Sequence, residues 1–235
     1  MSLSDTAPGI VEIHETPDPS LYARLLGDVG RSSRCPVLLG FRAVESAGGM
    51  PVPDDPWAAV EQTDAHAVLE RWWPGPCTAG CRCLDPWIDR FPPRPGPALD
   101  RSPESATLAA AVDFARDIGP YSDLAVVDAR RPADIPLAVR WSGAGNYADH
   151  DLVGLTAVLR SWEERFGATL VRLDGSTLTL TVAFPPETAV EAEAVAAEHF
   201  AFCPDQHDPQ NGTVHTPRSY AATLRGAWTW RFWWD

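Results

Sequence analysis

The clearest regular pattern lies in the C-terminal half of the chain, where apolar residues recur every three or four positions. This spacing places them on one face of a helix that Asp151 can cap at its start and Gly167 can end. The apolar face of this predicted helix comprises Leu152, Leu155, Val158, Leu159, Trp162 and Phe166. A helix of this kind packs its apolar stripe on a sheet or on other helices.

A β-hairpin is predicted directly after this helix. Its strands are residues 169–173 and 176–184, which flank the dipeptide Asp174-Gly175. A type I′ turn needs positive φ at both central residues, and aspartate followed by glycine is favoured there. In the second strand, large apolar residues alternate with threonines, so one face of the strand is expected to line a core.

Two more helices and a strand complete this half. One helix is predicted from Pro186, in its first turn, to about residue 202, and the other from Thr216-Pro217 to Gly226. The last eight residues alternate between two faces and predict a strand. Its core face is predicted to carry Trp228, Trp230, Phe232 and Trp234.

The N-terminal half is dominated by proline: 15 of the 23 prolines lie before residue 105. The elements predicted before residue 130 are helices at 20–29 (capped by Ser20), 64–73 and 105–117, strands at 36–41 and 124–127, and a long irregular loop at 75–97. The next segment, residues 131–140, is ambiguous between helix and strand. Together the patterns predict an α+β fold with a mixed, largely antiparallel sheet, in which a proline-rich part, 1–105, packs on a C-terminal domain, 106–235.

Composition narrows the possible functions. Of the 235 residues 45% are hydrophobic and 22% charged, the balance of a soluble globular protein. No apolar run is long enough to cross a bilayer and the N-terminus lacks an export signal, so a cytoplasmic location is expected. All 19 basic residues are arginines, which excludes lysine Schiff bases and a P-loop lysine. The formal net charge of -13 disfavours nucleic acid and membrane surfaces as partners.

Three segments resemble the signatures of a known family: LRSWEERFGATLVRL at 159–173, AAEHFAFCPD at 196–205 and RFWWD at 231–235. They are similar to the DUF4253 domain family, which is common in actinobacteria and has no established activity, and the resemblance extends from about residue 124 to the C-terminus. It also implies family positions at Trp141, Gly143, Asn146, Gln210 and Gly212. Asn211 departs from the family pattern, in which the glutamine and glycine are adjacent.

Three cysteines in seven residues, Cys77, Cys81 and Cys83, form one candidate site. Thiolates bind zinc, and Cys203, His207 or His215 could supply a fourth ligand. The C-x3-C-x-C spacing matches no common zinc motif, so free thiols in a cysteine-rich loop are the alternative. Apart from zinc, no cofactor is expected, because no G-x-G-x-x-G sequence is completed near residues 143–151.

The second candidate site brings together Cys203, Asp205 and His207, to which Gln210, His215 and Asn146 could be added. A thiol, a carboxylate and an imidazole are the groups of nucleophilic catalysis. However, Cys203 follows the predicted C-terminus of a helix, where the helix dipole and Asp205 both raise the pKa of a thiol. We therefore expect a packed, unreactive cysteine.

These observations favour a non-catalytic binding or regulatory module whose acidic surface recognises a protein partner, for example a basic one. The alternative is a hydrolase or metal-dependent enzyme with its site around Cys203, Asp205 and His207. Convergence of these side chains in an open cleft would favour the enzyme, and their separation would favour the binding module.

Overall fold

The computed structural model describes residues 7–15, 18–96, 104–117, 122–147, 151–207 and 214–235. Its centre is a six-stranded sheet with the order β1-β3-β2-β4-β5-β6. The strands are β1 (Ile10–His14), β2 (Arg34–Leu39), β3 (Asp123–Asp128), β4 (Ala168–Leu173), β5 (Thr177–Val182) and β6 (Thr229–Trp233). Only β2 and β4 pair in parallel, so the predicted α+β class with a mixed, largely antiparallel sheet is confirmed.

The N-terminal part of the chain contributes to the middle of this sheet as well as to its edge. Strand β2 lies between β3 and β4, with Leu38 opposite Leu124 on one side and Arg172 on the other. Strand β1 pairs with β3 at the edge. The two parts of the chain therefore share one sheet.

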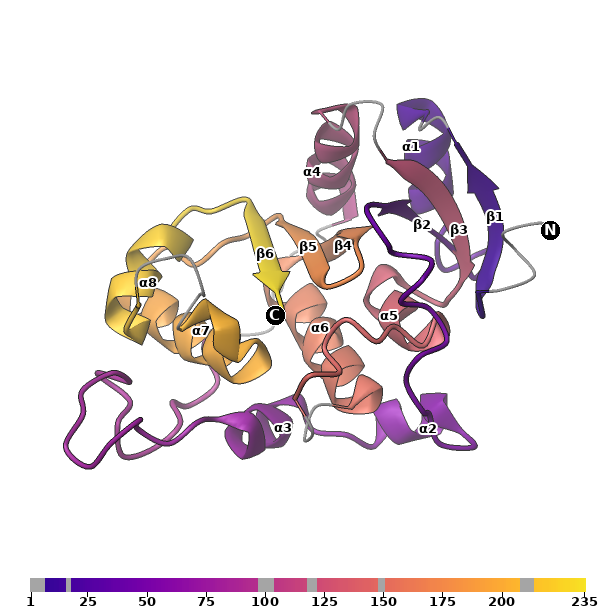
Figure 1. Cartoon of the computed structure of the whole chain (residues 1–235). Helices are drawn as coiled ribbons and strands as arrows, with labels where there is room; N and C mark the ends of the chain where they lie inside the picture. The colour runs from indigo at the N-terminus through magenta and orange to yellow at the C-terminus, as the bar shows by residue number, and fades with distance from the viewer. Residues whose placement is uncertain (1–6, 16–17, 97–103, 118–121, 148–150, 208–213) are drawn as a thin grey trace.

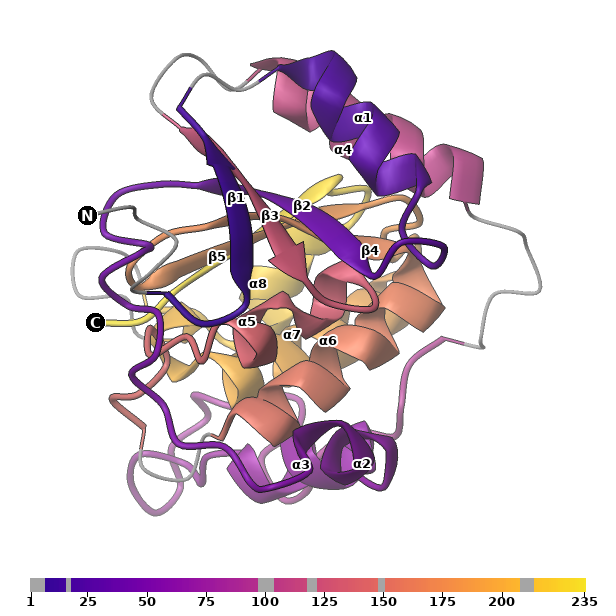
Figure 2. The same ribbon diagram turned by 90° about the vertical axis from the view of Figure 1, so that its right-hand side faces the viewer.

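Helices cover both faces of the sheet, as Figure 2 shows. On one face, α1 (Pro19–Gly27) and α4 (Glu104–Asp117) enclose a small core that includes Tyr22, Leu124 and Val171. On the other face lies a larger core under α5 (Ile135–Ala138), α6 (Leu152–Phe166) and α7 (Ala189–Phe202). The remaining helices are α2 (Pro56–Glu61), α3 (Ala65–Trp72), α8 (Pro217–Leu224) and the short 3-10 turns η2 (Pro132–Asp134) and η3 (Pro204–Gln206) (Figure 1). All six residues of β5 are buried because α4 packs on its threonine face.

The predicted helix at 152–166 is confirmed with both of its ends. The Asp151 carboxylate accepts a hydrogen bond from the Gly154 backbone N–H at 2.6 Å. Gly167 adopts φ +59, the left-handed conformation that closes a helix.

In the described part of the chain, no helix combines the length and the apolar character that crossing a bilayer requires.

The hairpin is confirmed, but its predicted type I′ turn is wrong. Residues 174–176 connect the strands, and neither Asp174 nor Gly175 is among the positive-φ residues of the described chain. Tertiary contacts hold this turn instead: the Gly175 N–H donates to the Phe41 carbonyl at 2.8 Å, and Arg172 donates to the Asp174 carboxylate. Contacts with a distant segment therefore overrode the local preference.

Three smaller predictions also need correction, and in each the real cap or strand end lies near the predicted one. Helix α1 is capped by Asp18 rather than Ser20, whose N–H donates to the Asp18 carboxylate. Helix α7 begins after its Thr188 cap, so Pro186 lies outside it. Trp228 is 61% exposed because it precedes the first paired residue of β6, whereas Trp230, Phe232 and Trp234 are buried as predicted.

Candidate functional site

The cysteine-rich loop is fixed at its C-terminal end and exposed at its tip. Leu84 is buried, and the Trp87 indole N–H donates to the Glu193 carbonyl of α7 at 3.1 Å. Asp85 forms an ion pair with Arg218 of α8 at 3.2 Å. The loop is thus attached to two helices of the C-terminal half, and residues 77–83 project from that attachment.

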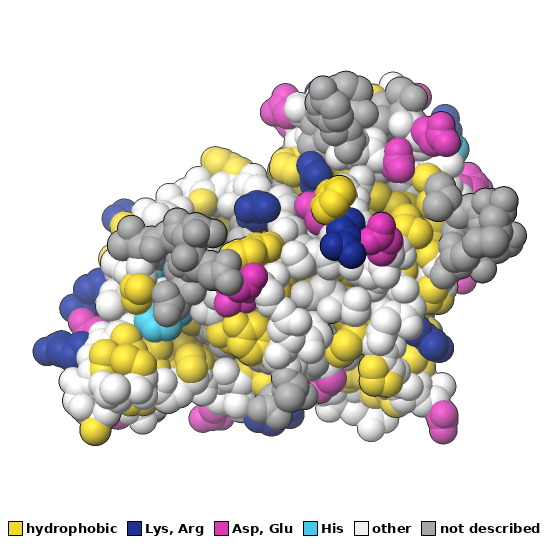
Figure 3. All heavy atoms as spheres, viewed as in Figure 1, with side chains coloured by type: hydrophobic (Ala, Val, Ile, Leu, Met, Phe, Trp, Pro, Cys, Tyr) yellow, Lys and Arg dark blue, Asp and Glu magenta, His cyan; other side chains and the backbone are white. Residues whose placement is uncertain are grey.

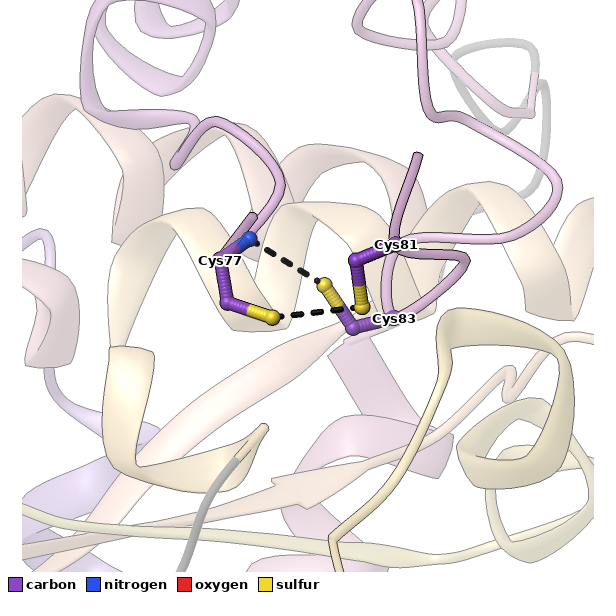
Figure 4. Close-up of side chains that lie close together, drawn as sticks. All are labelled: Cys77, Cys81 and Cys83. Atoms are coloured by element: carbon purple, nitrogen blue, oxygen red, sulfur yellow. Dashed lines mark hydrogen bonds between the residues drawn. The ribbon is translucent and has the colours of Figure 1, made fainter. Parts of the chain in front are cut away.

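The three thiols of the tip converge, as Figure 4 shows. The Cys77 Sγ donates to the Cys81 Sγ at 3.2 Å, and the Cys77 backbone N–H donates to the Cys83 Sγ at 3.5 Å. The three sulfur atoms lie within 4.8 Å of one another. Gly80 makes the turn possible with φ +79, a conformation that favours glycine.

This spacing suits a thiophilic metal ion. Three thiolates that are each about 2.3 Å from a zinc ion lie about 3.8 Å from one another, so small side-chain rotations would complete the coordination. Among the described residues, none of the predicted fourth ligands Cys203, His207 and His215 joins the three thiols. The fourth position of such a site would be open to water or to another molecule.

The hydrogen bonds within the cluster polarise its thiols. The pKa of Cys81 is lowered, chiefly because the Cys77 thiol donates to its sulfur and next because the Cys83 backbone N–H does so. The pKa of Cys77 is raised because it is the donor of that bond. Cys81 therefore loses its proton more readily than Cys77 to give the thiolate, the form that binds metals.

Cys203, the proposed nucleophile, is buried and faces the C-terminal strand. Its thiol donates to the Trp233 carbonyl at 3.1 Å. Burial raises its pKa, and the charge of Asp205 raises it further. Sequence analysis expected a packed Cys203 and a contribution of Asp205 to its raised pKa, but it named the helix dipole as the other cause, whereas burial is the largest one. A protonated, enclosed thiol is a poor nucleophile.

Residues 203–206 bind the outer edge of β6, which is the last strand of the sheet. In addition to the Cys203 bond, the Gln206 side-chain amide donates to the Arg231 carbonyl at 2.7 Å, and the Asp235 N–H donates to the Asp205 carboxylate at 3.1 Å. These bonds satisfy backbone groups of alternate residues, which the edge strand would otherwise leave unpaired. Sequence analysis missed this role, because the alternation in residues 231–235 does not show which edge of the strand lacks a partner strand.

The remaining members of the predicted catalytic set are not assembled into a cleft. The His207 Nδ1 lies 2.6 Å from the His215 carbonyl, and the Tyr147 hydroxyl donates to Asp205 at 2.9 Å. Asn146 is exposed on its own turn. Gln210 lies outside the described residues.

Another group that sequence analysis missed is a buried polar cluster between α6 and α7. The Glu198 Oε2 accepts hydrogen bonds from Arg165 and from the Trp162 indole, both at 2.7 Å. The neighbouring His199 is enclosed by aromatic rings, and its Nδ1 lies 3.2 Å from the Tyr220 hydroxyl. These groups are buried too deeply to meet a substrate and hold the two helices together.

A polar cleft of about 340 Å³ lies between the N-terminal helices α2 and α3 and helix α6. Its three arginines are ion-paired: Arg94 with Asp64 at 2.6 Å, Arg131 with Glu164 at 3.3 Å and Arg160 with Asp134 at 2.7 Å. Beside it, burial raises the pKa of Glu163 to about 7, an effect that Arg131 opposes. Each of these ion pairs lies within one part of the chain, and among the described residues the ion pair that links the two parts at this cleft is the one between Glu61 of α2 and Arg130, at 3.1 Å.

Glu163 and His199 make opposite contributions to the pH dependence of stability, which offset each other between pH 6.5 and 5. Burial, and next the charge of Arg165, lower the pKa of His199 from 6.5 to about 3, so the unfolded chain takes up the extra proton and stability falls as the pH drops below 6.5. The raised pKa of Glu163 makes the folded chain take up a proton between pH 7 and 4.5, so stability rises as the pH falls. In Glu163→Gln only the effect of His199 remains. Urea unfolding should therefore show that the free energy of unfolding of this variant falls by about 2 kcal/mol more than that of the wild type between pH 6.5 and 5. Equal slopes for variant and wild type would contradict this assignment.

Comparison with known proteins identifies one half of the chain. A family model described as a domain of unknown function, DUF4253, matches residues 123–235. No match to a curated protein or to a solved structure was found. The matched range agrees with the signature segments at 159–173, 196–205 and 231–235, all of which lie inside it. Residues 123–235 are therefore identified as a DUF4253 domain, a domain of unknown function.

Proposed function

We propose that the protein is a non-catalytic binding module that holds one thiophilic metal ion, such as Zn²⁺, through Cys77, Cys81 and Cys83. The observation that carries this proposal is the convergence of three sulfur atoms within 4.8 Å on an exposed, anchored turn. Soft thiolate ligands select zinc or monovalent copper over the hard cations magnesium and calcium. With three protein ligands, the ion keeps one position for exchange or for a partner's ligand.

The alternative of a hydrolase around Cys203, Asp205 and His207 has weaker support. Cys203 is buried with a raised pKa, and Asp205 already accepts bonds from Tyr147 and from the backbone of Asp235. A catalytic thiol needs a nearby base and access to a substrate carbonyl. These side chains instead serve the packing of β6, which favours a binding role for the chain.

Zinc titration of the metal-free protein tests the proposal. The protein is prepared with a reductant and a chelator, desalted, and titrated with Zn²⁺ against a colorimetric chelator of known affinity. We expect one equivalent of tightly bound zinc, with weaker binding at lower pH because protons compete for the thiolates. The absence of any zinc binding by the reduced, folded protein would overturn the proposal.

The acidic composition supports a second role, recognition of a basic protein partner by the same module. The formal net charge is -13, although Figure 3 shows arginine and acidic side chains interspersed on one face. Electrostatic recognition weakens with ionic strength. The immobilised protein should therefore retain an arginine-rich peptide at about 50 mM salt and release it at about 500 mM. Retention that does not depend on salt, or no retention at all, would remove this role.

A further inference from the structure

Two of the three thiols are positioned to form a covalent bond with each other. The Cys77 and Cys81 sulfur atoms are 3.2 Å apart, and a disulfide needs about 2.0 Å. They lie four residues apart on the exposed tip, where Cys77 is exposed and Cys81 half-buried. In Figure 4 the two side chains point toward each other. Rotation of exposed side chains, without repacking of the core, would bring the sulfur atoms together.

The other cysteines are either protected or less well placed. Cys35 and Cys203 are buried, and each thiol donates to a backbone carbonyl, of Ala129 and Trp233 respectively. Cys83 is half-buried and faces the Cys77 backbone N–H. An oxidant in solution therefore reaches the thiols of the tip before the buried ones, and Cys77 and Cys81 are adjacent there.

We propose that Cys77 and Cys81 form a reversible disulfide that dismantles the metal site, so that the oxidation state of this loop controls metal binding. The regulatory meaning rests on the proposed function, whereas formation of the disulfide does not. Reduced, the loop offers three sulfur ligands to an ion. Oxidised, it offers one, Cys83, because disulfide sulfur is a poor metal ligand.

Hydrogen peroxide supplies the oxidising equivalents in the simplest form of this reaction. A sulfur of the pair attacks one peroxide oxygen, the O–O bond breaks, and the sulfenic acid forms with release of water. The second sulfur then attacks the first, the S–O bond breaks, and a second water leaves with the proton of the second thiol. Two thiols are oxidised by two electrons and one peroxide is reduced to two waters. A dithiol returns the loop to the reduced form by exchange.

Thiol counting on the metal-free full-length protein tests the disulfide. One equivalent of peroxide should reduce the reagent-accessible thiols of the native protein from three to one, and those of the denatured protein from five to three. Peptide mapping should place the bond between residues 77 and 81. Cys83→Ser should still form it, whereas the double variant Cys77→Ser with Cys83→Ser leaves Cys81 as the single thiol of the tip and should accumulate a sulfenic acid that dimedone traps. Dithiothreitol should restore all five thiols.

Several results would overturn the inference. Three accessible thiols after peroxide, a wild-type disulfide that peptide mapping places between other cysteines, or disulfide-linked dimers in place of the internal bond would each do so. Zinc bound beforehand should slow the oxidation at least tenfold, and unchanged rates would break the link to the metal. Because the disulfide is measured without metal, a protein that binds zinc but forms no disulfide refutes only this inference. A protein that forms the disulfide but binds no zinc refutes the proposed function and the link to the metal.

Discussion

Replacing Glu198 with glutamine is expected to lower the free energy of unfolding by about 3–5 kcal/mol. The Glu198 and Arg165 side chains are 1% and 5% exposed, and their charged atoms lie 2.7 Å apart. Arg165 also donates to the Pro95 carbonyl at 2.8 Å, so its guanidinium stays fixed in the core when its partner is removed. An unpaired buried charge costs far more than the pair itself contributes.

Two comparisons isolate the buried charge as the cause. Glu193 lies on the same helix as Glu198, and Glu193→Gln breaks its partly exposed ion pair with Arg218 of α8, which should cost about 1 kcal/mol or less. The double change Arg165→Met with Glu198→Leu leaves no charge in the core and should recover most of the loss. Urea unfolding monitored by tryptophan fluorescence measures all three variants. A loss below about 1 kcal/mol for Glu198→Gln would show that water reaches Arg165.

The elements that the sequence predicted well are those with local causes. Helix α6 has its own apolar stripe, the Asp151 cap and the Gly167 end, so a window of seventeen residues contains all the needed information. The order of the strands has no such local cause. The central place of β2 depends on its pairing with β3 and β4, which follow it by about ninety and one hundred and thirty residues.

The same distinction holds for the candidate site. The spacing of Cys77, Cys81 and Cys83 indicated a possible metal loop, but its attachment depends on Glu193 and Arg218, more than one hundred residues away. Of the described residues of the Cys203 constellation, only Cys203 and Asp205 bond to the C-terminal strand, and this role was not predicted. That role depends on which edge of β6 stays unpaired, and no local pattern shows it.

The signature segments of the DUF4253 domain bind one another. Trp162 in the first segment donates to Glu198 in the second, and Cys203 and Asp205 in the second bond to the backbone of the third. The segments therefore describe how this domain closes its core. The three thiols, by contrast, lie outside the matched residues 123–235. Metal binding would accordingly be a property of the N-terminal part, at a loop that is attached to helices α7 and α8 of the DUF4253 domain.

Replacing Cys81 with serine is expected to weaken zinc binding on the order of 100-fold or more. Four-ligand zinc sites in small domains bind with about 10–16 kcal/mol, so one thiolate is worth roughly 3 kcal/mol. Cys81 is the most informative of the three cysteines because Cys77 donates to its sulfur, which gives it the lowered pKa of the cluster. Competition between the protein and a colorimetric chelator at constant pH measures the change.

Thr78→Ser is the matched control, because Thr78 lies on the same exposed turn and contributes its backbone carbonyl, which the Cys81 N–H contacts at 3.0 Å. It should bind zinc as the wild type does. Cys77→Ser and Cys83→Ser should each weaken binding to a similar extent as Cys81→Ser, since two thiolates and two water molecules hold zinc poorly. If Cys81→Ser retained wild-type affinity, the ion would be held elsewhere, and the convergence of the three sulfur atoms would have no bearing on it.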